Sequence, residues 1–199
     1  MLLTDFRRSA SALAAIVVAA LTAQPISAQI RHTAADAEFM RGMIAHHGQA
    51  VVMSRLVPDR SQFTPVRMLA ERIDVSQKDE IALMRQWLRD RNEALPDTAA
   101  AGHQHHHSSW GVPRAGFRSK EDLPRLATPP GTEFDRLFLE LMIRHHEGAI
   151  TMVRSLFGTP ASGQETEIFR LAADIEADQR AEIQRMHNLL KTLSSAETR

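Results

Sequence analysis

The chain has 199 residues, with 24 basic and 24 acidic side chains, ten histidines and no cysteine. The balanced charge argues against a nucleic-acid-binding protein, and a chain without cysteine can form neither disulfides nor thiolate metal sites. Nine methionines, no tyrosine and an aromatic content of 5% are more typical of a helical bundle than of a β-sandwich.

The first 28 residues have the layout of a secretory signal peptide. Arg7 and Arg8 precede an apolar run over residues 10–23, and Ala28 provides a small residue at a cleavage point. The run is shorter than the ~20 apolar residues that span a bilayer, although an uncleaved anchor is the alternative. We therefore expect a secreted or periplasmic protein with no stable membrane span after cleavage, and one domain over residues 29–199.

Two helices are expected in the first half of this domain, because apolar residues recur there three and four positions apart. The first is expected over residues 34–57, capped by Thr33 and stopped by Pro58. The second is expected over residues 65–94, with a proline in its first turn, where prolines are tolerated.

Two further helices are expected after a long linker. The linker, residues 95–131, is rich in Pro, Gly, Ser and His, and a helical turn is expected in it over residues 119–123. A third helix is expected over residues 133–157, capped by Thr132. The fourth is expected from a capping box, Ser162 to Glu165, to about residue 193.

The two halves of the domain repeat one pattern. Met43-Ile44-Ala45-His46-His47 returns 99 residues later as Met142-Ile143-Arg144-His145-His146. Gln77, Glu80, Ile81 and Met84 return 102 residues later as Gln179, Glu182, Ile183 and Met186. The repeated unit is a helical hairpin, residues 34–94 and 132–194. Two such hairpins predict an all-α, antiparallel four-helix bundle.

The repeated histidines and methionines are candidates for metal binding. Met43, His46 and Met53 share one stripe of a helix, and His47 lies about 100° around it. We therefore expect one histidine of each pair to point into the bundle and its neighbour to lie on a flank. An antiparallel return helix would place Gln77 and Glu80 opposite His46.

This donor set favours copper. Thioether sulfur is soft and selects Cu(I), while imidazole suits several transition metals, which stay open as alternatives. Binding needs neutral imidazole, so it should weaken below about pH 6. The predicted ligands are Met43, His46, His47, Met53, Glu80 and Met84 in the first hairpin, and Met142, His145, His146, Met152, Glu182 and Met186 in the second.

The linker carries a second candidate, four histidines within five residues. A run of this composition binds transition metals, either to load the core sites or as a solvated loop. The residues are His103, His105, His106 and His107. His32 is expected to be a stray exposed residue, and His187 to face solvent or a helix flank.

Two other functions stay open on these residues. In the first, the methionines are core filler and the histidine pairs hydrogen-bond to Glu80 or Glu182, locking the hairpin register through a buried polar network in a structural or partner-binding bundle. In the second, the bundle is a metal-dependent redox enzyme. The Glu-x-x-His pattern of di-iron bundles is missing around both pairs, since Met43 and Met142 stand at the glutamate position.

Together these residues resemble a known family. The pattern M-x-x-H-H-x-x-A-[VI]-x-M, followed by Gln77-x-x-Glu80-Ile81-x-x-Met84-x-x-Trp87, is similar to the secreted bacterial family called domain of unknown function 305. The resemblance covers about residues 34–193 and is carried by both halves. Its marks fall on Met43, His46, His47 and Met53, and on Met142, His145, His146 and Met152.

The resemblance implies a ferritin-like four-helix bundle and an exported protein, with copper handling in some relatives. The family often reads His-His-Gln-Gly-Ala, whereas this chain has Gly48-Gln49 in one copy and Glu147-Gly148 in the other. Equal affinity of the two halves is therefore not implied. The favoured hypothesis is an exported, non-enzymatic protein that binds a copper ion for sequestration or tolerance, with homo-oligomerisation left open.

Overall fold

The computed structural model describes residues 32–96 and 122–197 and contains no β-strand within those ranges. The predicted signal peptide and the linker histidines lie outside the described residues. The long helices are α1 (Ala34–Ser54), α3 (Thr64–Asp90), α5 (Gly131–Gly158) and α6 (Thr166–Glu197), and the short ones are α2 (Val57–Arg60) and α4 (Asp122–Leu126). Within these same ranges, no helix combines the length and apolarity needed to cross a membrane.

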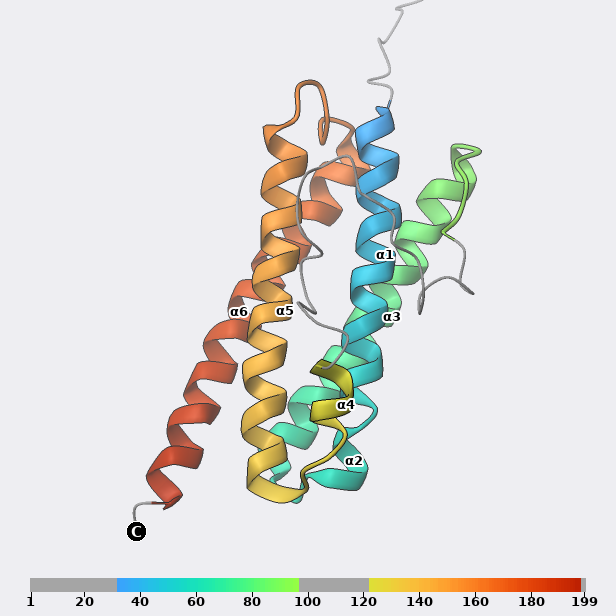
Figure 1. Ribbon diagram of the computed structural model, residues 1–199. Helices are drawn as coiled ribbons and strands as arrows, with labels where there is room; N and C mark the ends of the chain where they lie inside the picture. Colours follow the sequence, from blue (N-terminus) through green and yellow to red (C-terminus); the bar gives the residue numbers. More distant parts are fainter. Residues whose placement is uncertain (1–31, 97–121, 198–199) are drawn as a thin grey trace, which may run out of the picture.

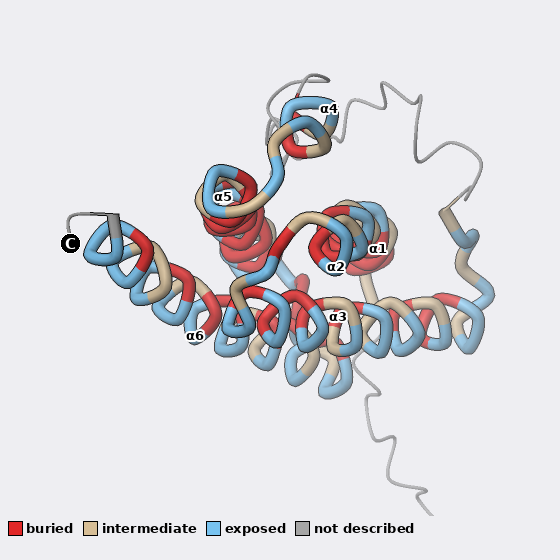
Figure 2. The backbone as a smooth tube through the Cα atoms, turned by 90° about the horizontal axis from the view of Figure 1, so that it is seen from below, coloured by how far each residue is buried: buried red, intermediate tan, exposed pale blue. Residues whose placement is uncertain are grey.

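The four long helices form two hairpins that pack together. Helix α1 packs along α3, α5 packs along α6, and the hairpins meet mainly through α1 and α5 (Figure 1). Figure 2 shows α3 and α6 on one side of the α1–α5 pair and α4 on the other, with the buried residues of α3 and α6 turned toward the pair. This arrangement confirms the predicted antiparallel bundle of two repeated hairpins.

Two apolar clusters fill the bundle, one toward each end. One includes Met53, Ile73, Phe134 and Met186, and the other includes Met43, Met84, Val153 and Ile175. Each of the four long helices contributes one segment to each cluster. On every helix, polar residues lie between these two segments. We call these residues the polar layer: His46, His47, Gln77, Glu80, His145, His146, Gln179 and Glu182.

The first helix begins where predicted and ends earlier. Thr33 caps α1 in a capping box, with its side chain accepting from the Asp36 backbone N–H and the Asp36 carboxylate accepting from Thr33 N. Helix α1 ends at Ser54, however, and Pro58 lies in the first turn of α2. A proline is compatible with that position because a first-turn residue has no intrahelical N–H partner to lose.

The later helix starts differ from the prediction. Pro130, not Thr132, is the residue before the first turn of α5. Of the helical turn predicted over residues 119–123, the described part lies in α4, and residues 119–121 are outside the described residues. Helix α6 begins at Thr166, and the Ser162–Glu165 pair does not cap it in the predicted way. The Ser162 hydroxyl hydrogen-bonds to Thr33 instead, and Glu165 accepts from Trp87 and Arg91. Tertiary partners therefore take the place of the local cap.

Candidate functional site

The two histidine pairs meet at the centre of the bundle. His47 and His146 are fully buried, and His46 and His145 are 4% and 1% exposed. The prediction of one flanking histidine in each pair is therefore wrong. Helices α1 and α5 each pack against two neighbours, so two faces about 100° apart are covered at once.

The rings of His46 and His145 lie against each other, tilted, across the contact between α1 and α5. Their centroids are 3.7 Å apart and their planes are inclined by 36°. Nε2 of His145 donates to the backbone carbonyl of His46 over 2.8 Å. The repeat thus places one histidine directly against its counterpart from the other half.

The second histidine of each pair, His47 or His146, bonds to a glutamate of its own hairpin. His47 Nε2 lies 2.5 Å from Glu80 Oε2, and His146 Nε2 lies 2.7 Å from Glu182 Oε2. The antiparallel return predicted Glu80 and Glu182 on this side of the bundle, and these bonds confirm their positions.

The polar layer holds many buried atoms without a hydrogen-bond partner. In the described part of the chain, twelve buried side-chain N and O atoms lack one, and eight of them belong to this layer. Buried polar atoms are normally satisfied, so such a concentration calls for an explanation. The eight are His46 Nδ1 and Nε2, the Nδ1 atoms of His47, His145 and His146, both side-chain atoms of Gln77, and Gln179 Oε1.

The buried environment favours the neutral form of His46 and His145. Burial, reinforced by repulsion from His145 and His47, lowers the pKa of His46 well below its usual value. Burial and repulsion from His146 and His47 lower the pKa of His145 in the same way. A neutral ring keeps one nitrogen lone pair free to act as a ligand.

The predicted methionines lie on both sides of the polar layer. Met43 is about one turn from His46 and His47 along α1, and it shares an apolar cluster with Met84, against which Met152 packs. The other cluster contains Met53, Met142 and Met186. Each cluster therefore combines methionines of both hairpins, a crossing that the sequence pattern did not reveal, and the cluster that contains Met43 also contains Met40, which was not predicted.

The carboxylates and imidazoles of the described residues do not form a ready metal site by themselves. Within the described ranges, no group of three or more His, Asp or Glu side chains is placed to hold a metal ion. The other soft donors near the layer are the methionine sulfurs, and thioether with imidazole is a ligand set that suits Cu(I). Three of the histidines donate one ring N–H to a carboxylate or carbonyl while the other ring nitrogen stays without a partner.

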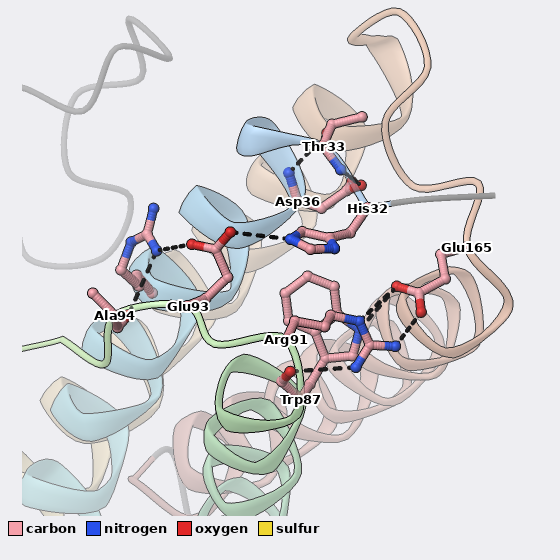
Figure 3. A network of polar contacts seen from close by, with 9 residues as sticks. His32, Thr33, Asp36, Trp87, Arg91, Glu93, Ala94 and Glu165 are labelled. Atoms are coloured by element: carbon pink, nitrogen blue, oxygen red, sulfur yellow. Dashed lines mark hydrogen bonds and ion pairs between the residues drawn. The ribbon is translucent and has the colours of Figure 1, made fainter. Parts of the chain in front are cut away.

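Sequence reasoning missed two features near the predicted residues. Arg72 of α3 pairs with Glu182 of α6 over 3.7 Å, a contact between hairpins that no motif indicated. His32 is not a stray residue, because it bonds to Glu93 and makes a T-shaped ring contact with Trp87, which also lies against the guanidinium of Arg91 (Figure 3). This network fastens the start of α1 to the end of α3. His187 is exposed as predicted.

A family model described as "Domain of unknown function (DUF305)" matches residues 36–193. The chain belongs to this family. A DUF305 fragment from Deinococcus radiodurans has 30% identity and a TM-score of 0.67, with 81% of this chain and 98% of that chain covered. The "putative secreted protein DUF305" from Streptomyces coelicolor has 31% identity and a TM-score of 0.68, with coverages of 80% and 92%.

The solved structures similar to this DUF305 chain include CopM in two copper-bound forms. The Cu(I)-bound form has 26% identity and a TM-score of 0.61, covering 79% of this chain and 96% of that chain. The Cu(II)-bound form has 28% identity, a TM-score of 0.62 and the same coverages, 79% and 96%. A short match to uncharacterized protein L153 of Acanthamoeba polyphaga mimivirus has 36% identity over 56 residues, which is 28% of this chain and 37% of that protein.

Proposed function

We propose that this protein is an exported copper-binding protein that holds the ion in its polar layer for sequestration or tolerance. The observation that carries the proposal is the bonding pattern of His47, His145 and His146. Each donates one ring N–H to a carboxylate or carbonyl and keeps its Nδ1 buried without a partner. Metal-ligating histidines are commonly oriented in this way.

The methionines supply the soft thioether ligands that a Cu(I) site requires. Met43, Met84, Met142 and Met186 lie within about one turn of the layer along their helices, and a sulfur that moves toward the histidines would complete a Cu(I) site. The copper-bound forms of CopM support the choice of metal. Copper would be cargo in this role, so the residues need to bind, shield and release it.

Export supports the same role, because copper defence is useful outside the reducing cytoplasm. The similarity to the "putative secreted protein DUF305" from Streptomyces coelicolor agrees with the predicted signal peptide. If the full chain is expressed in a bacterial host, the protein recovered from the periplasm should begin at Gln29 by mass spectrometry. Recovery of an intact N-terminus from the membrane fraction would contradict export in this form.

A competitive titration tests copper binding directly. The full chain recovered from the periplasm, and a variant with His103, His105, His106 and His107 all changed to Ala, are titrated with Cu(I) against a chromogenic chelator. Both should bind with the same affinity. Adding His46→Ala and His145→Ala should weaken binding at least about tenfold, the effect expected for loss of buried ligands. Loss of all Cu(I) binding in the linker variant would overturn the proposal.

The bonds of Glu80 and Glu182 also favour a second candidate, a non-catalytic bundle in which the polar layer fixes the hairpin register. This candidate and copper binding differ in their response to metal. If the layer is only structural, His46→Ala with His145→Ala should lower the melting temperature equally with and without Cu(I). If it binds copper, Cu(I) should raise the melting temperature of the parent protein but not of the variant.

A further inference from the structure

The two glutamates of the polar layer, one on α3 and one on α6, differ in their partners and in their exposure. The Glu182 side chain is 5% exposed and is shared, with Oε2 on His146 and Oε1 on Arg72. The Glu80 side chain is 14% exposed, and in the described part of the chain its recorded partner is His47. One glutamate is therefore paired with an arginine, and the other, also largely buried, is somewhat more open to solvent.

The sequence repeat makes this difference an inversion of charge. At the 102-residue offset that relates α3 to α6, Arg72 corresponds to Asp174, and both residues are exposed. At this repeat position the half that contains His146 has a cation paired with its glutamate, whereas the corresponding residue for the half that contains His47 is an anion. A surface charge at such a position changes the rate at which a cation arrives more than it changes stability.

Arg72 also lies between Glu182 and open solvent. It lines a shallow depression of about 480 Å³ on the outer face of α3, with Met68, Glu71, Val75, Ser76 and Asp79. Its side chain is 55% exposed, while Glu182 beneath it and His146 beyond that are buried. The carboxylates of Glu71 and Asp79 also line this depression, but among its lining residues Arg72 is the one whose recorded ion pair is with Glu182.

We propose that the two halves exchange copper unequally: the half of His47 and Glu80 is the open port, and Arg72 is a positioning residue that holds Glu182 on His146 and slows passage of the ion there. This inference rests on the proposed copper binding. The ion pair is partly exposed, so its contribution to stability is small. The ion pair instead changes the rates of copper uptake and release.

Single-half proteins measure the two rates separately. In the chain without linker histidines, His146→Ala leaves the first half intact and His47→Ala leaves the second. Release of Cu(I) to an excess of chromogenic chelator is followed by stopped-flow absorbance. We expect the second half to release copper more slowly by a factor of about three or more, in line with the effect of local charge on association.

Charge changes at the repeat positions then identify the cause. Arg72→Asp should accelerate release from the second half and leave the first unchanged, while Arg72→Lys should keep the slow rate. Asp174→Arg, the mirror change, should slow the first half. Circular dichroism and an unchanged melting temperature show that each surface variant is folded.

The outcomes separate this inference from the function on which it rests. If the chain without linker histidines binds no Cu(I), copper binding and the unequal halves are both overturned. If it binds Cu(I) but Arg72→Asp leaves the second half unchanged, or accelerates both halves alike, copper binding stands and the role of Arg72 is overturned.

Discussion

At the scale of single residues, the contact of His46 with His145 shows how burial in a low-dielectric interior lowers the pKa of an imidazole. Both rings are buried, and charging either one would place a cation beside other histidines without solvent. The pair is therefore compatible with folding only while it is neutral. In the folded protein these two rings therefore resist protonation, and acid should favour the unfolded chain, in which they are free to bind protons.

Stability should consequently fall as the solution is acidified. The unfolded chain binds protons on His46 and His145 near pH 6.5, whereas the folded chain, in which the pKa of both is lowered, binds them only at lower pH. Unfolding free energy should drop between pH 7 and pH 5 by up to about 1.4 kcal/mol per pH unit for each proton. Urea unfolding at several pH values measures this slope.

The double variant His46→Gln, His145→Gln provides the test of that assignment. It removes both titrating rings, so its stability should depend less on pH in the same interval. His187→Gln, which changes an exposed histidine, is the matched control and should keep the original slope. A slope that survives the double change and disappears in the control would contradict the assignment.

Residue types and spacing predicted part of this site. The antiparallel return placed Glu80 on the histidine side of the first hairpin, and the repeat offsets of 99 and 102 residues placed Glu182 likewise in the second. They could not predict that all four histidines are buried, because a helical repeat gives the angle between side chains but not the number of neighbours around the helix. The Arg72–Glu182 pair joins two hairpins with no shared motif.

At the scale of the elements, the periodicity predicted all four long helices, and the errors lie at their ends. Thr33 caps α1 because its partner Asp36 is three residues away in the same chain segment. Ser162 and Glu165 have the same local pattern, but Thr33, Trp87 and Arg91 offer partners from other helices. The sequence of one segment does not reveal whether its polar side chains will bond locally or to residues of other helices.

Two glycines at helix connections allow a sharp test of loop strain. Gly131 and Gly163 both have positive φ, 65° and 68°. A Cβ at Gly131 would meet no atom within 4 Å, whereas a Cβ at Gly163 would lie 2.7 Å from Cδ1 of Phe157. Gly131→Ala should therefore cost about 1–2 kcal/mol of unfolding free energy, and Gly163→Ala at least about 1 kcal/mol more.

Gly48→Ala is the matched control for these two changes. Gly48 lies inside α1 and a Cβ there would also meet nothing within 4 Å, so alanine should stabilise the protein by up to about 1 kcal/mol. Equal denaturation midpoints for Gly131→Ala and Gly163→Ala would show that the Phe157 contact does not restrict the loop.

At the scale of the whole molecule, each end of the bundle is fastened by an aspartate that reaches from one hairpin to the loop of the other. Asp36 Oδ1 accepts from the Gly163 backbone N–H over 2.7 Å. Asp135 is buried, which raises the pKa of its carboxyl, and the nearby buried Ser61 of the other hairpin acts in the opposite direction. Asp36 and Asp135 are separated by the same 99 residues as the histidine pairs, but the sequence did not predict that each one reaches toward the opposite half.

These two contacts should contribute independently to stability. Asp36→Ala removes a helix cap and leaves a buried N–H without a partner, so it should cost about 2–3 kcal/mol. Asp135→Ala should cost about 1 kcal/mol, and the double variant should show the sum because the sites lie at opposite ends. Denaturant unfolding measures all three.

Asparagine at position 135 is the control for charge. Because burial disfavours the ionised Asp135, Asp135→Asn should keep a bond to Ser61 and be neutral or slightly stabilising at pH 7. A marked loss of stability in Asp135→Asn, or a double alanine variant far from additive, would contradict two separate fastenings.

The contact of His46 with His145 has a consequence for the origin of the bundle. These two residues correspond in the repeat, and their rings lie against each other. A side chain meets its own copy only near an approximate two-fold axis, and such an axis is also what a symmetric pair of identical subunits requires. A single hairpin that dimerised about this point would bring the same histidines together, so a gene encoding half of this chain could already have formed the layer before duplication joined the copies.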